Sequence, residues 1–490
     1  MDTWALIEAQ FRDETLVSQQ IDSYNQFVEE TIPEIIEENS VIDPEIGDFK
    51  IELKGVHIER PMAVEIDGSV RRLYPMEARI RDRNYMATLY VDMIAIRRGV
   101  EIQRARMRIG EFPVMVRSNL CWLKGLSEKE LIELGEDPLD FGGYFIINGK
   151  EKILIAHSEP APNKVIVSRS TRSNISAVAQ ISSRRGMYTG RVEVARRNDG
   201  IWYVHFPLAP RNLKWIILMR ALGFTDDQEI LDAFLGEKEV LNDALLNLES
   251  SEIKTEEEAI DYIGKFIAPG QIKEYRLHRA QEVIDNYLLP HIGTSPEDRR
   301  AKGYFILRMA ERTSEAAYGL RSFDDKDHLA NKRIELSGKL METLFRFAFR
   351  SLVKDIRFQV ERALARRKKL RLNTVVRPNA FTEAIMYGMS TGTWPNRRTG
   401  VAQNMNRLNF IAPIYMARRV NSPLSKRRKN FEAREVHGTH FGRFCPIQTP
   451  EGISTGLIKY LALTAKATTA SDAEKIDRLL NKLGVKPVVG

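Results

Sequence analysis

The sequence predicts a multidomain α+β protein with a strand-rich part, an inserted mostly helical part and an irregular C-terminal region. Three observations predict this class. Apolar and polar residues alternate over residues 49–117 and 164–206, which is the period of half-buried strands. Apolar residues at helical spacing follow from Leu213 onwards, and regular periodicity is lost after Arg377-Pro378. A chain of 490 residues has room for about two to four domains, each with its own core.

The N-terminal part is expected to hold one helix followed by strands. Residues 14–38 place apolar side chains at helical spacing, and Pro33 is expected to break or kink that helix. Residues 49–117 alternate, as in "FKIELKGVHIERP", and are expected to form strands. The segment Tyr144–Ala156 predicts a β-hairpin, because Asn148-Gly149 supplies the positive φ that a tight primed turn needs.

Short strands are expected to continue to residue 206, with turns at "RRG" and "NDG". A long amphipathic helix with few breakers is predicted over roughly Asp327–Lys369. Between these two parts, helical spacing predicts helices over residues 213–224, 226–249, 272–289 and 303–319.

The composition excludes several classes of protein. The hydrophobic fraction is 43% and the charged fraction 29%, as in globular proteins. No apolar run approaches the roughly 20 residues needed to cross a bilayer, and the acidic N-terminus lacks the features of a secretory signal. Two cysteines, Cys121 and Cys445, cannot build a disulfide framework. We therefore expect a cytoplasmic protein that does not associate with membranes.

Positive charge gathers in a few runs along the chain. The chain carries 74 Lys and Arg against 66 Asp and Glu, a formal net charge of +8. The basic runs are Arg104–Arg108, Arg362–Arg371 and Arg418–Lys429, whereas residues 13–48 are acidic. Clustered cations often contact nucleic-acid backbone, because each neutralised phosphate releases condensed counterions. A solvated surface is the ordinary alternative for any single run.

His437, His440 and Cys445 have the spacing of a possible zinc site, with Glu451 as a fourth ligand. The pattern favours structural histidines at a loop base, since the fourth ligand lies across a proline-containing turn. Cys445 stands in an extended context, whereas a nucleophilic cysteine is usually activated at a helix N-terminus or by a positioned base. The acids of Asp324–Asp327 are better explained as a cap of the following helix than as a Mg²⁺ site. No metal ligand and no catalytic residue is assigned to this chain.

The segment "QTPEGISTGL" presents Gln448, Thr449 and Glu451 between residues that let the backbone turn sharply and approach a ligand closely. Upstream, "VAQNMNRLNF" offers Gln403 and Arg407 within a polar donor set suited to phosphate, sugar or base edges. An ordinary polar loop is an equally good interpretation from these residues alone.

Long stretches of the sequence resemble one family, in family order along nearly the whole chain. "GTHFGRFCPIQTPEGISTGLIKYLAL" resembles the fork segment of the second-largest subunit of multisubunit DNA-dependent RNA polymerases. "LVSQQIDSYNQFV" resembles that family's N-terminal helix, and "GGYFIINGKEKILIAHSEPAPNKVIV" its protrusion hairpin. "DDKDHLANKRIELSGKL" resembles the return from the lobe, and "NSPLSKRRKNFEAREVHGTHFGR" the run that lines the rifamycin pocket of bacterial polymerases.

The resemblance implies a division into domains. Residues 1–165 and 329–389 would form the protrusion, residues 166–328 the inserted lobe, and residues 390–490 the fork region. In the family, a full-length second subunit continues far beyond the fork. The length of this chain therefore resembles the split arrangement of some archaea, in which the N-terminal half (B″) and the remainder (B′) are separate chains.

The resemblance also implies a function in template-directed RNA synthesis from NTPs. In the family, aspartates of the largest subunit bind the catalytic Mg²⁺, so this chain is expected to bind none and to be inactive alone. The expected partners are the B′ half, the largest subunit and other polymerase subunits, together with DNA template, RNA transcript and NTPs. A stand-alone nucleic-acid-binding protein without polymerase partners is the competing hypothesis.

The site residues implied by the resemblance lie in the fork region. The substrate-proximal positions are Gln403, Gln448 and Glu451. Family members commonly have Glu where this chain has Gln448, and a neutral amide cannot balance a neighbouring cation. The nucleic-acid-binding positions are Arg407, Lys426, Arg427, Arg428, Lys429 and Arg434.

Overall fold

The computed structural model confirms the α+β class, with several sheets and many helices. The chain folds as two compact units: unit 1 comprises Met1–Glu159 and Ile334–Gly490, and unit 2 comprises Pro160–Arg333. The residues that the structure describes are 4–5, 8–9, 15–44, 49–186, 188–366, 371–395, 398–469 and 473–485.

Unit 1 begins with the helical segment predicted over residues 14–38, which the structure confirms from Ser18 onwards. Helix α2 (Ser18–Gln26) passes through a π-helical turn (Phe27–Thr31) into α3 (Ile32–Glu38). The wide turn lies directly before Pro33, the residue expected to disturb the helix. A π-turn inserted in an α-helix absorbs such a local irregularity without ending the helix.

The main sheet of unit 1 is antiparallel and has the order β1-β2-β5-β6. Its strands confirm the alternation predicted over residues 49–117: along β5, Leu89, Val91 and Met93 are buried while their neighbours are less so. A short hairpin, β3 and β4, and the unpredicted helix α4 interrupt that range. The bounds are β1 Val41–Ile42, β2 Phe49–Glu59, β3 Met62–Val64, β4 Val70–Arg72, α4 Pro75–Ile80, β5 Met86–Arg97 and β6 Val100–Pro113.

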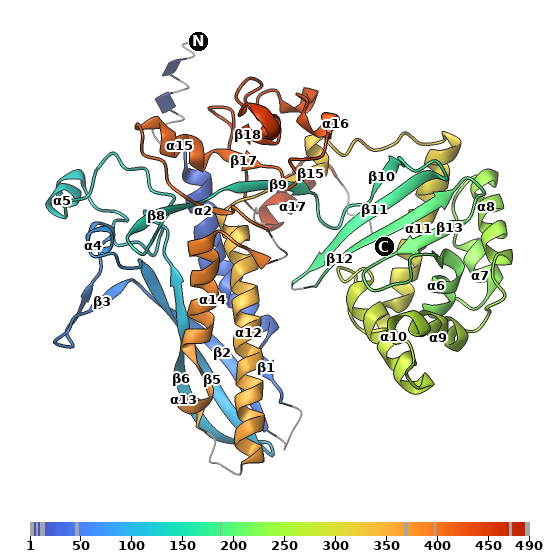
Figure 1. The fold of residues 1–490 in the computed structure, drawn as a ribbon, viewed down its shortest axis with the longest axis horizontal. Coiled ribbons are helices and arrows are strands. Elements are labelled where there is room, and N and C mark those ends of the chain that lie inside the picture. Colours follow the sequence, from blue (N-terminus) through green and yellow to red (C-terminus); the bar gives the residue numbers. More distant parts are fainter. Residues whose placement is uncertain are drawn as a thin grey trace. The chain divides into compact units, whose positions relative to one another are not determined.

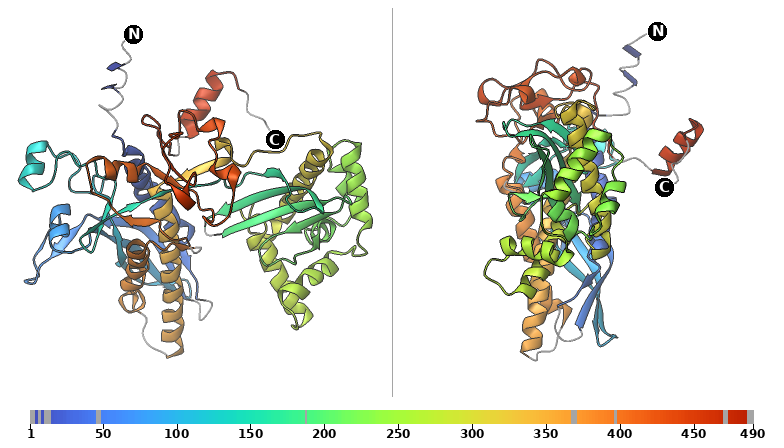
Figure 2. Two further views of the ribbon diagram at one scale, coloured as in Figure 1. Left: turned by 45° about the horizontal axis from the view of Figure 1, so that its top comes forward. Right: turned by 90° about the vertical axis from the view of Figure 1, so that its right-hand side faces the viewer.

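Two helices from later in the chain, α12 (Ser337–Ala365) and α14 (Pro378–Thr391), run side by side in unit 1, and α14 packs on β6 (Figure 1; Figure 2). The ring of Phe345 meets those of Phe27, Phe112 and Phe381 at centroid distances of 5.8, 6.5 and 5.1 Å. Aromatic rings thus join the N-terminal helix, the sheet and both later helices in one core.

Two predictions in this part of the chain are wrong. The long helix begins at Ser337, ten residues later than expected, because a 3₁₀ turn (Leu329–Asn331) and strand β15 (Lys332–Glu335) come first. The loss of periodicity expected after Pro378 is contradicted by α14, which starts at that proline. Proline suits the first helical position, where its missing N–H would be unpaired in any case.

The hairpin predicted at Tyr144–Ala156 is confirmed. Strands β7 (Phe145–Ile147) and β8 (Lys150–Leu154) pair antiparallel, and the turn residues Asn148 and Gly149 have φ of 49° and 69°. Strand β16 (Ala402–Asn404) adds to the other edge of β8, with Gln403 opposite Ile153. The hairpin therefore positions a residue that lies 250 positions further along the chain.

A second small sheet organises the C-terminal segment, defined here as residues 398–485. Strand β17 (Arg419–Asn421) lies between β9 (Ala156–Pro160), to which it is parallel, and β18 (Ile458–Tyr460), to which it is antiparallel. The rest of the segment is irregular, as predicted. Its short elements are α15 Ile411–Ala417, α16 Phe431–Arg434, the 3₁₀ turns Gly438–His440 and Gly452–Ser454, and α17 Ala473–Lys482.

Unit 2 has an antiparallel five-stranded sheet, β10-β11-β12-β13-β14, followed by helices α6 to α11. Helix α11 (Arg299–Tyr318) packs on β11 and β12, and the core includes stacked Trp202 and Phe234. The predicted strands and helices are present, and α9 is a helix that the sequence did not predict. The other bounds are β10 Ile166–Arg169, β11 Ile175–Arg185, β12 Tyr188–Arg197, β13 Trp202–His205, β14 Leu213–Lys214, α6 Trp215–Ala221, α7 Asp227–Asp232, α8 Lys238–Glu249, α9 Glu256–Ile267 and α10 Lys273–Tyr287.

Within the described part of the chain, no helix combines the length and the apolar content that a membrane span requires.

Candidate functional site

The C-terminal segment is anchored to the rest of unit 1 by a buried arginine. The guanidinium of Arg418 donates to the backbone carbonyl oxygens of Leu16, Leu463 and Ala465 at 2.7, 3.1 and 2.9 Å. Burial lowers its pKa, and no carboxylate among the described residues pairs with it. The first cation of the run Arg418–Lys429 is therefore a structural anchor and is not available to a ligand.

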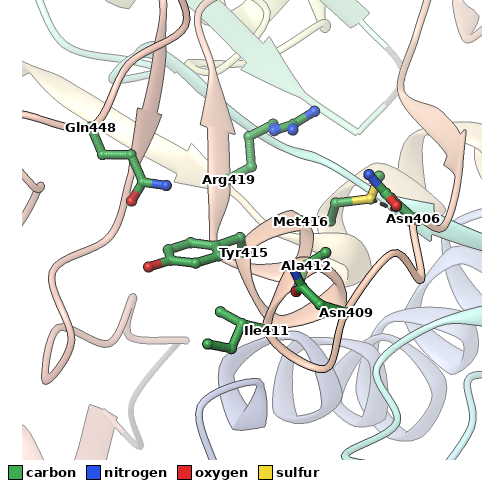
Figure 3. Close-up of a pocket in the computed structure, with 8 residues that line it drawn as sticks. All are labelled: Asn406, Asn409, Ile411, Ala412, Tyr415, Met416, Arg419 and Gln448. Atoms are coloured by element: carbon green, nitrogen blue, oxygen red, sulfur yellow. Dashed lines mark hydrogen bonds between the residues drawn. The ribbon is translucent and has the colours of Figure 1, made fainter.

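Next to this anchor is a cavity of about 460 Å³ (Figure 3). Helix α15 supplies one wall, including Tyr415, and β17 contributes Arg419. Gln448 extends from a separate loop toward Tyr415 (Figure 3). The cavity combines aromatic, amide and guanidinium groups in one place. All of its lining residues are Asn406, Asn409, Ile411, Ala412, Tyr415, Met416, Arg419 and Gln448.

Gln403 does not line this cavity, but it contacts Arg419, which does. One terminal nitrogen of Arg419 lies 3.4 Å from the Gln403 amide oxygen, and the Gln403 amide nitrogen donates to the Gly400 carbonyl at 2.9 Å. The Arg419 guanidinium lies over the Tyr460 ring, at 5.7 Å from its centroid. Its Nε is buried and has no hydrogen-bond partner among the described residues. Of the three predicted substrate-proximal residues, Gln403 thus bonds to Arg419, and Gln448 lines the same cavity as Arg419.

The Pro-Glu-Gly turn, residues 449–456, is held by its own hydroxyl groups. The Thr449 hydroxyl donates to the Ile458 carbonyl at 3.1 Å and accepts from the Gly456 N–H at 2.8 Å. The Thr455 hydroxyl donates to the Gly452 carbonyl at 2.7 Å. Glu451 is exposed on this turn, and its carboxylate forms no hydrogen bond or ion pair with a described residue. The structure therefore presents Glu451 to solvent and does not place it among the lining of the cavity.

The basic loop, residues 426–429, is an exposed cluster of positive charge in the C-terminal segment. Lys426, Arg427, Arg428 and Lys429 are all exposed, and none of these side chains pairs with a described residue. Four adjacent cations without counter-ions can attract a polyanion, because the charges are not neutralised within the chain.

The other two predicted nucleic-acid-binding arginines are bound within unit 1. Arg407 forms an ion pair with Glu151 and another with Asp140, the latter at 3.2 Å. Its hydrogen bond to Glu151 raises the pKa of Arg407 above the ordinary value. Arg434 donates to backbone carbonyls at 2.8–3.4 Å on two neighbouring loops.

The first basic run, Arg104–Arg108, is also neutralised locally. Arg104 pairs with Glu101 at 3.1 Å and Arg106 with Asp92 at 3.0 Å, along strands β5 and β6. Arg108 pairs with Glu111 in the same way. In the second run, Arg362–Arg371, residues 367–370 lie outside the described residues.

His437 and His440 bond to neighbouring residues of the C-terminal segment. The buried His440 accepts from the His437 N–H at 3.3 Å through Nδ1, and its ring meets Phe444 at a centroid distance of 5.5 Å. The His437 ring lies against the Thr439 hydroxyl at 2.7 Å. The described residues contain no group of three or more His, Cys, Asp or Glu side chains that could hold a metal ion.

The acids of Asp324–Asp327 do not cap the long helix, which corrects the sequence interpretation. Asp324 accepts from the Val167 N–H at 2.8 Å, and Asp327 pairs with Lys332 at 2.7 Å. They bind local partners because the helix starts only at Ser337.

Sequence reasoning missed Arg419 and Tyr415 as site residues. Arg419 lies in a predicted basic run but carries no local signal that separates it from its neighbours. Its position depends on the pairing of β17 with β18, which the order of residues near Arg419 does not specify.

Comparison with known proteins shows similarity along the whole chain. Residues 15–383 match the family model described as RNA polymerase beta subunit, and residues 403–467 match RNA polymerase Rpb2, domain 3. DNA-directed RNA polymerase subunit Rpo2N of Methanocaldococcus jannaschii is 43% identical over 490 residues, covering 98% of each chain. DNA-directed RNA polymerase subunit Rpo2 of Saccharolobus solfataricus is 41% identical over 489 residues, which are 99% of this chain and 44% of that protein. The chain thus spans less than half the length of Rpo2 and nearly all of Rpo2N.

Proposed function

This chain belongs to the RNA polymerase beta-subunit family, and we propose that it forms the N-terminal part of the second-largest subunit of an archaeal DNA-directed RNA polymerase. The Rpo2N relatives, which it matches along nearly their whole length, support a split subunit completed by a second chain. We also propose that the chain functions in the cytoplasm, where it binds DNA.

The structural observation that supports this proposal is the number of large apolar side chains exposed in the C-terminal segment. Leu408 and Ile447 are 85% and 86% exposed, far more than an isolated globular protein favours for large apolar side chains. Such a surface is expected where partner chains cover it in an assembly. Other exposed apolar side chains of the segment are Phe410, Phe431, Phe441, Ile453 and Leu463.

The proposed reaction is nucleotidyl transfer by the assembled enzyme. The 3′-oxygen of the RNA attacks the α-phosphorus of an NTP, a P–O bond forms, pyrophosphate leaves and the hydroxyl proton is released. Mg²⁺ bound by the largest subunit would stabilise the attacking and leaving oxygens. This chain would line part of the site that binds the substrates. It would be inactive without the other subunits.

Within that scheme, the residues of the C-terminal segment have distinct proposed roles. Gln403, Gln448 and Glu451 would face the substrate. The two glutamine amides would do so near Arg419, and the Glu451 carboxylate would do so from the Pro-Glu-Gly turn. The basic loop would contact the nucleic-acid backbone. A neutral Gln448 beside Arg419 leaves that cation available to an anionic ligand, which supports the assignment.

The proposed domains are a protrusion (1–165 and 329–389), an inserted lobe (166–328) and a fork region (390–490). The separate core of unit 2 supports an inserted lobe, and the short, irregular elements of the C-terminal segment support a fork region.

Affinity capture of the tagged chain from its own cells tests the proposal. After nuclease digestion removes bridging DNA, we expect the B′ chain, the largest subunit and other polymerase subunits in fixed stoichiometry, with RNA synthesis activity in the captured material. Recovery of the chain alone, with nucleic-acid affinity of its own, would instead support a stand-alone binding protein.

A further inference from the structure

Arg434, at the end of α16, is bonded to two loops at once. One terminal nitrogen donates to the carbonyl oxygens of Ile453 and Thr455 at 2.9 and 2.8 Å, both in the Pro-Glu-Gly turn. The other donates to the carbonyl oxygens of Lys426 and Arg428 at 3.0 and 3.4 Å, both in the basic loop. The planar guanidinium can bind both loops because its two terminal nitrogens each carry N–H donors in a fixed planar geometry.

The backbone around Arg434 is packed against the same turn. A Cβ atom added at Gly456 would lie 2.2 Å from the Arg434 carbonyl oxygen and 2.6 Å from its Cα. Gly456 also has φ of +71°, which other residues rarely adopt. The Lys459 ammonium adds a hydrogen bond to the Ala433 carbonyl at 3.4 Å. The turn therefore approaches Arg434 through its backbone as well as through the guanidinium.

From this geometry we propose that Arg434 is a positioning residue that couples the basic loop to the Pro-Glu-Gly turn. Nucleic acid bound by the loop would then fix the turn that presents Glu451. This role replaces the direct nucleic-acid contact expected from the resemblance, since the terminal nitrogens already donate to four carbonyls. The inference rests on the proposed function, because it requires that the loop meets nucleic acid and the turn meets the substrate.

Lysine cannot reproduce this arrangement. Its ammonium is a single nitrogen with three donors on a flexible stem, so it cannot reach carbonyls on both sides as the guanidinium does. A lysine would, however, preserve the positive charge. The variant Arg434→Lys therefore separates the loss of positioning from the loss of charge.

The test uses the assembled polymerase with Arg434→Ala, Arg434→Lys or Gly456→Ala in this chain. We expect the maximal rate of single-nucleotide addition to fall about ten- to a hundredfold in all three variants. Misplacing the groups around a reacting substrate has effects of this size. We expect the slope of DNA affinity against salt to stay at the wild-type value in all three. Arg443→Ala is the matched control, because Arg443 lies in the same segment and its side chain makes one backbone bond to the described residues, to Thr439 at 3.2 Å.

Opposite results would overturn the proposal. If Arg434→Lys restores the rate and Arg434→Ala lowers the salt slope by about 0.9, Arg434 binds phosphate directly. Wild-type rates in all assembled variants would also reject the coupling. Assembly is scored first, and loss of assembly in all three variants but not in Arg443→Ala would assign Arg434 to folding alone. If the wild-type chain itself captures no polymerase subunits, the proposed function fails, which is a separate result.

Discussion

Several cations of this chain are buried and bonded to backbone oxygen atoms. Arg418 in unit 1 donates to carbonyls of segments far apart in sequence, and its pKa is lowered by burial. Lys302 in unit 2 is fully buried and donates to the Ile284 and Asp285 carbonyls at 3.2 and 2.6 Å. The N–H donors of such a buried cation bond to backbone carbonyl oxygens. Its loss of hydration disfavours the charged form and lowers its pKa.

Lys302 gives unit 2 a testable pH dependence. Burial lowers the pKa of Lys302 to about 8, whereas the unfolded chain keeps a lysine pKa of about 10.4. Between these values the unfolded state binds more protons than the folded state, so the free energy of unfolding rises with pH. We expect Lys302→Met to remove this increase in the free energy of unfolding. The increase is on the order of 3 kcal/mol between the two pKa values.

The measurement is urea unfolding of the full chain between pH 7 and pH 10, comparing wild type with Lys302→Met. The exposed Lys238 provides the control, and Lys238→Met is expected to keep the wild-type pH profile. Parallel profiles for wild type and Lys302→Met would show that the lysine is not desolvated in solution.

At the scale of elements, strand β6 and the basic loop differ in how their positive charges are paired. The arginines of β6 pair with carboxylates along the sheet, whereas the basic loop Lys426–Lys429 has no paired side chain among the described residues. The two runs are similar in sequence charge and differ in what the fold places beside them. A paired arginine contributes little to polyanion binding, because its charge is already compensated.

Neutralising the basic loop should weaken DNA binding by the assembled enzyme. We expect glutamine at Lys426, Arg427, Arg428 and Lys429 to reduce the slope of log affinity against log salt by up to about 0.9 for each phosphate that the loop no longer neutralises. The measurement is DNA affinity over a salt series. Neutralising Arg104, Arg106 and Arg108 is the control, and we expect its slope to match the wild type. An unchanged slope in the loop variant would remove the loop from the path of the nucleic acid.

At the scale of the whole molecule, the proposed function assigns exposed surfaces of this chain to contacts with other chains. Its C-terminal segment exposes large apolar side chains, and Glu451 stands on an exposed turn without a partner in the described part of the chain. In the proposed assembly, this carboxylate would meet a substrate or another subunit. Its effect is therefore expected in the complete enzyme.

We expect Glu451→Ala to slow nucleotide addition by the assembled enzyme while leaving assembly intact. The carboxylate has no structural role within the described residues, so its removal breaks no bond that holds the turn. Single-nucleotide addition rates measure the effect, with co-purified subunits as the measure of assembly. Glu435→Ala, at an exposed acid in the same segment, is the control. Wild-type rates in Glu451→Ala would reject the substrate-side role.

Local chemistry determined much of the fold from the sequence. The Asn148-Gly149 turn has the positive φ angles that the dipeptide predicts, and alternation located the strands of both units. These features depend on residues within a few positions of one another. The start of the long helix at Ser337 was missed because the preceding turn and strand gave little local signal. The existence of α14 was missed although Phe381, Ile385 and Met389 recur at helical spacing.

The sequence by itself also determined the family resemblance, the basic loop and the Gly/Pro-rich turn. Only the tertiary structure decided which cations remain available. Arg407, Arg418 and Arg434 are bound by carboxylates or carbonyls that strand pairing and loop packing bring to them. The cavity at Gln448 likewise depends on Arg419, which β17 and β18 hold in place. Charge and turn type belong to the residues themselves, whereas the partner of a side chain depends on how distant parts of the chain pack together.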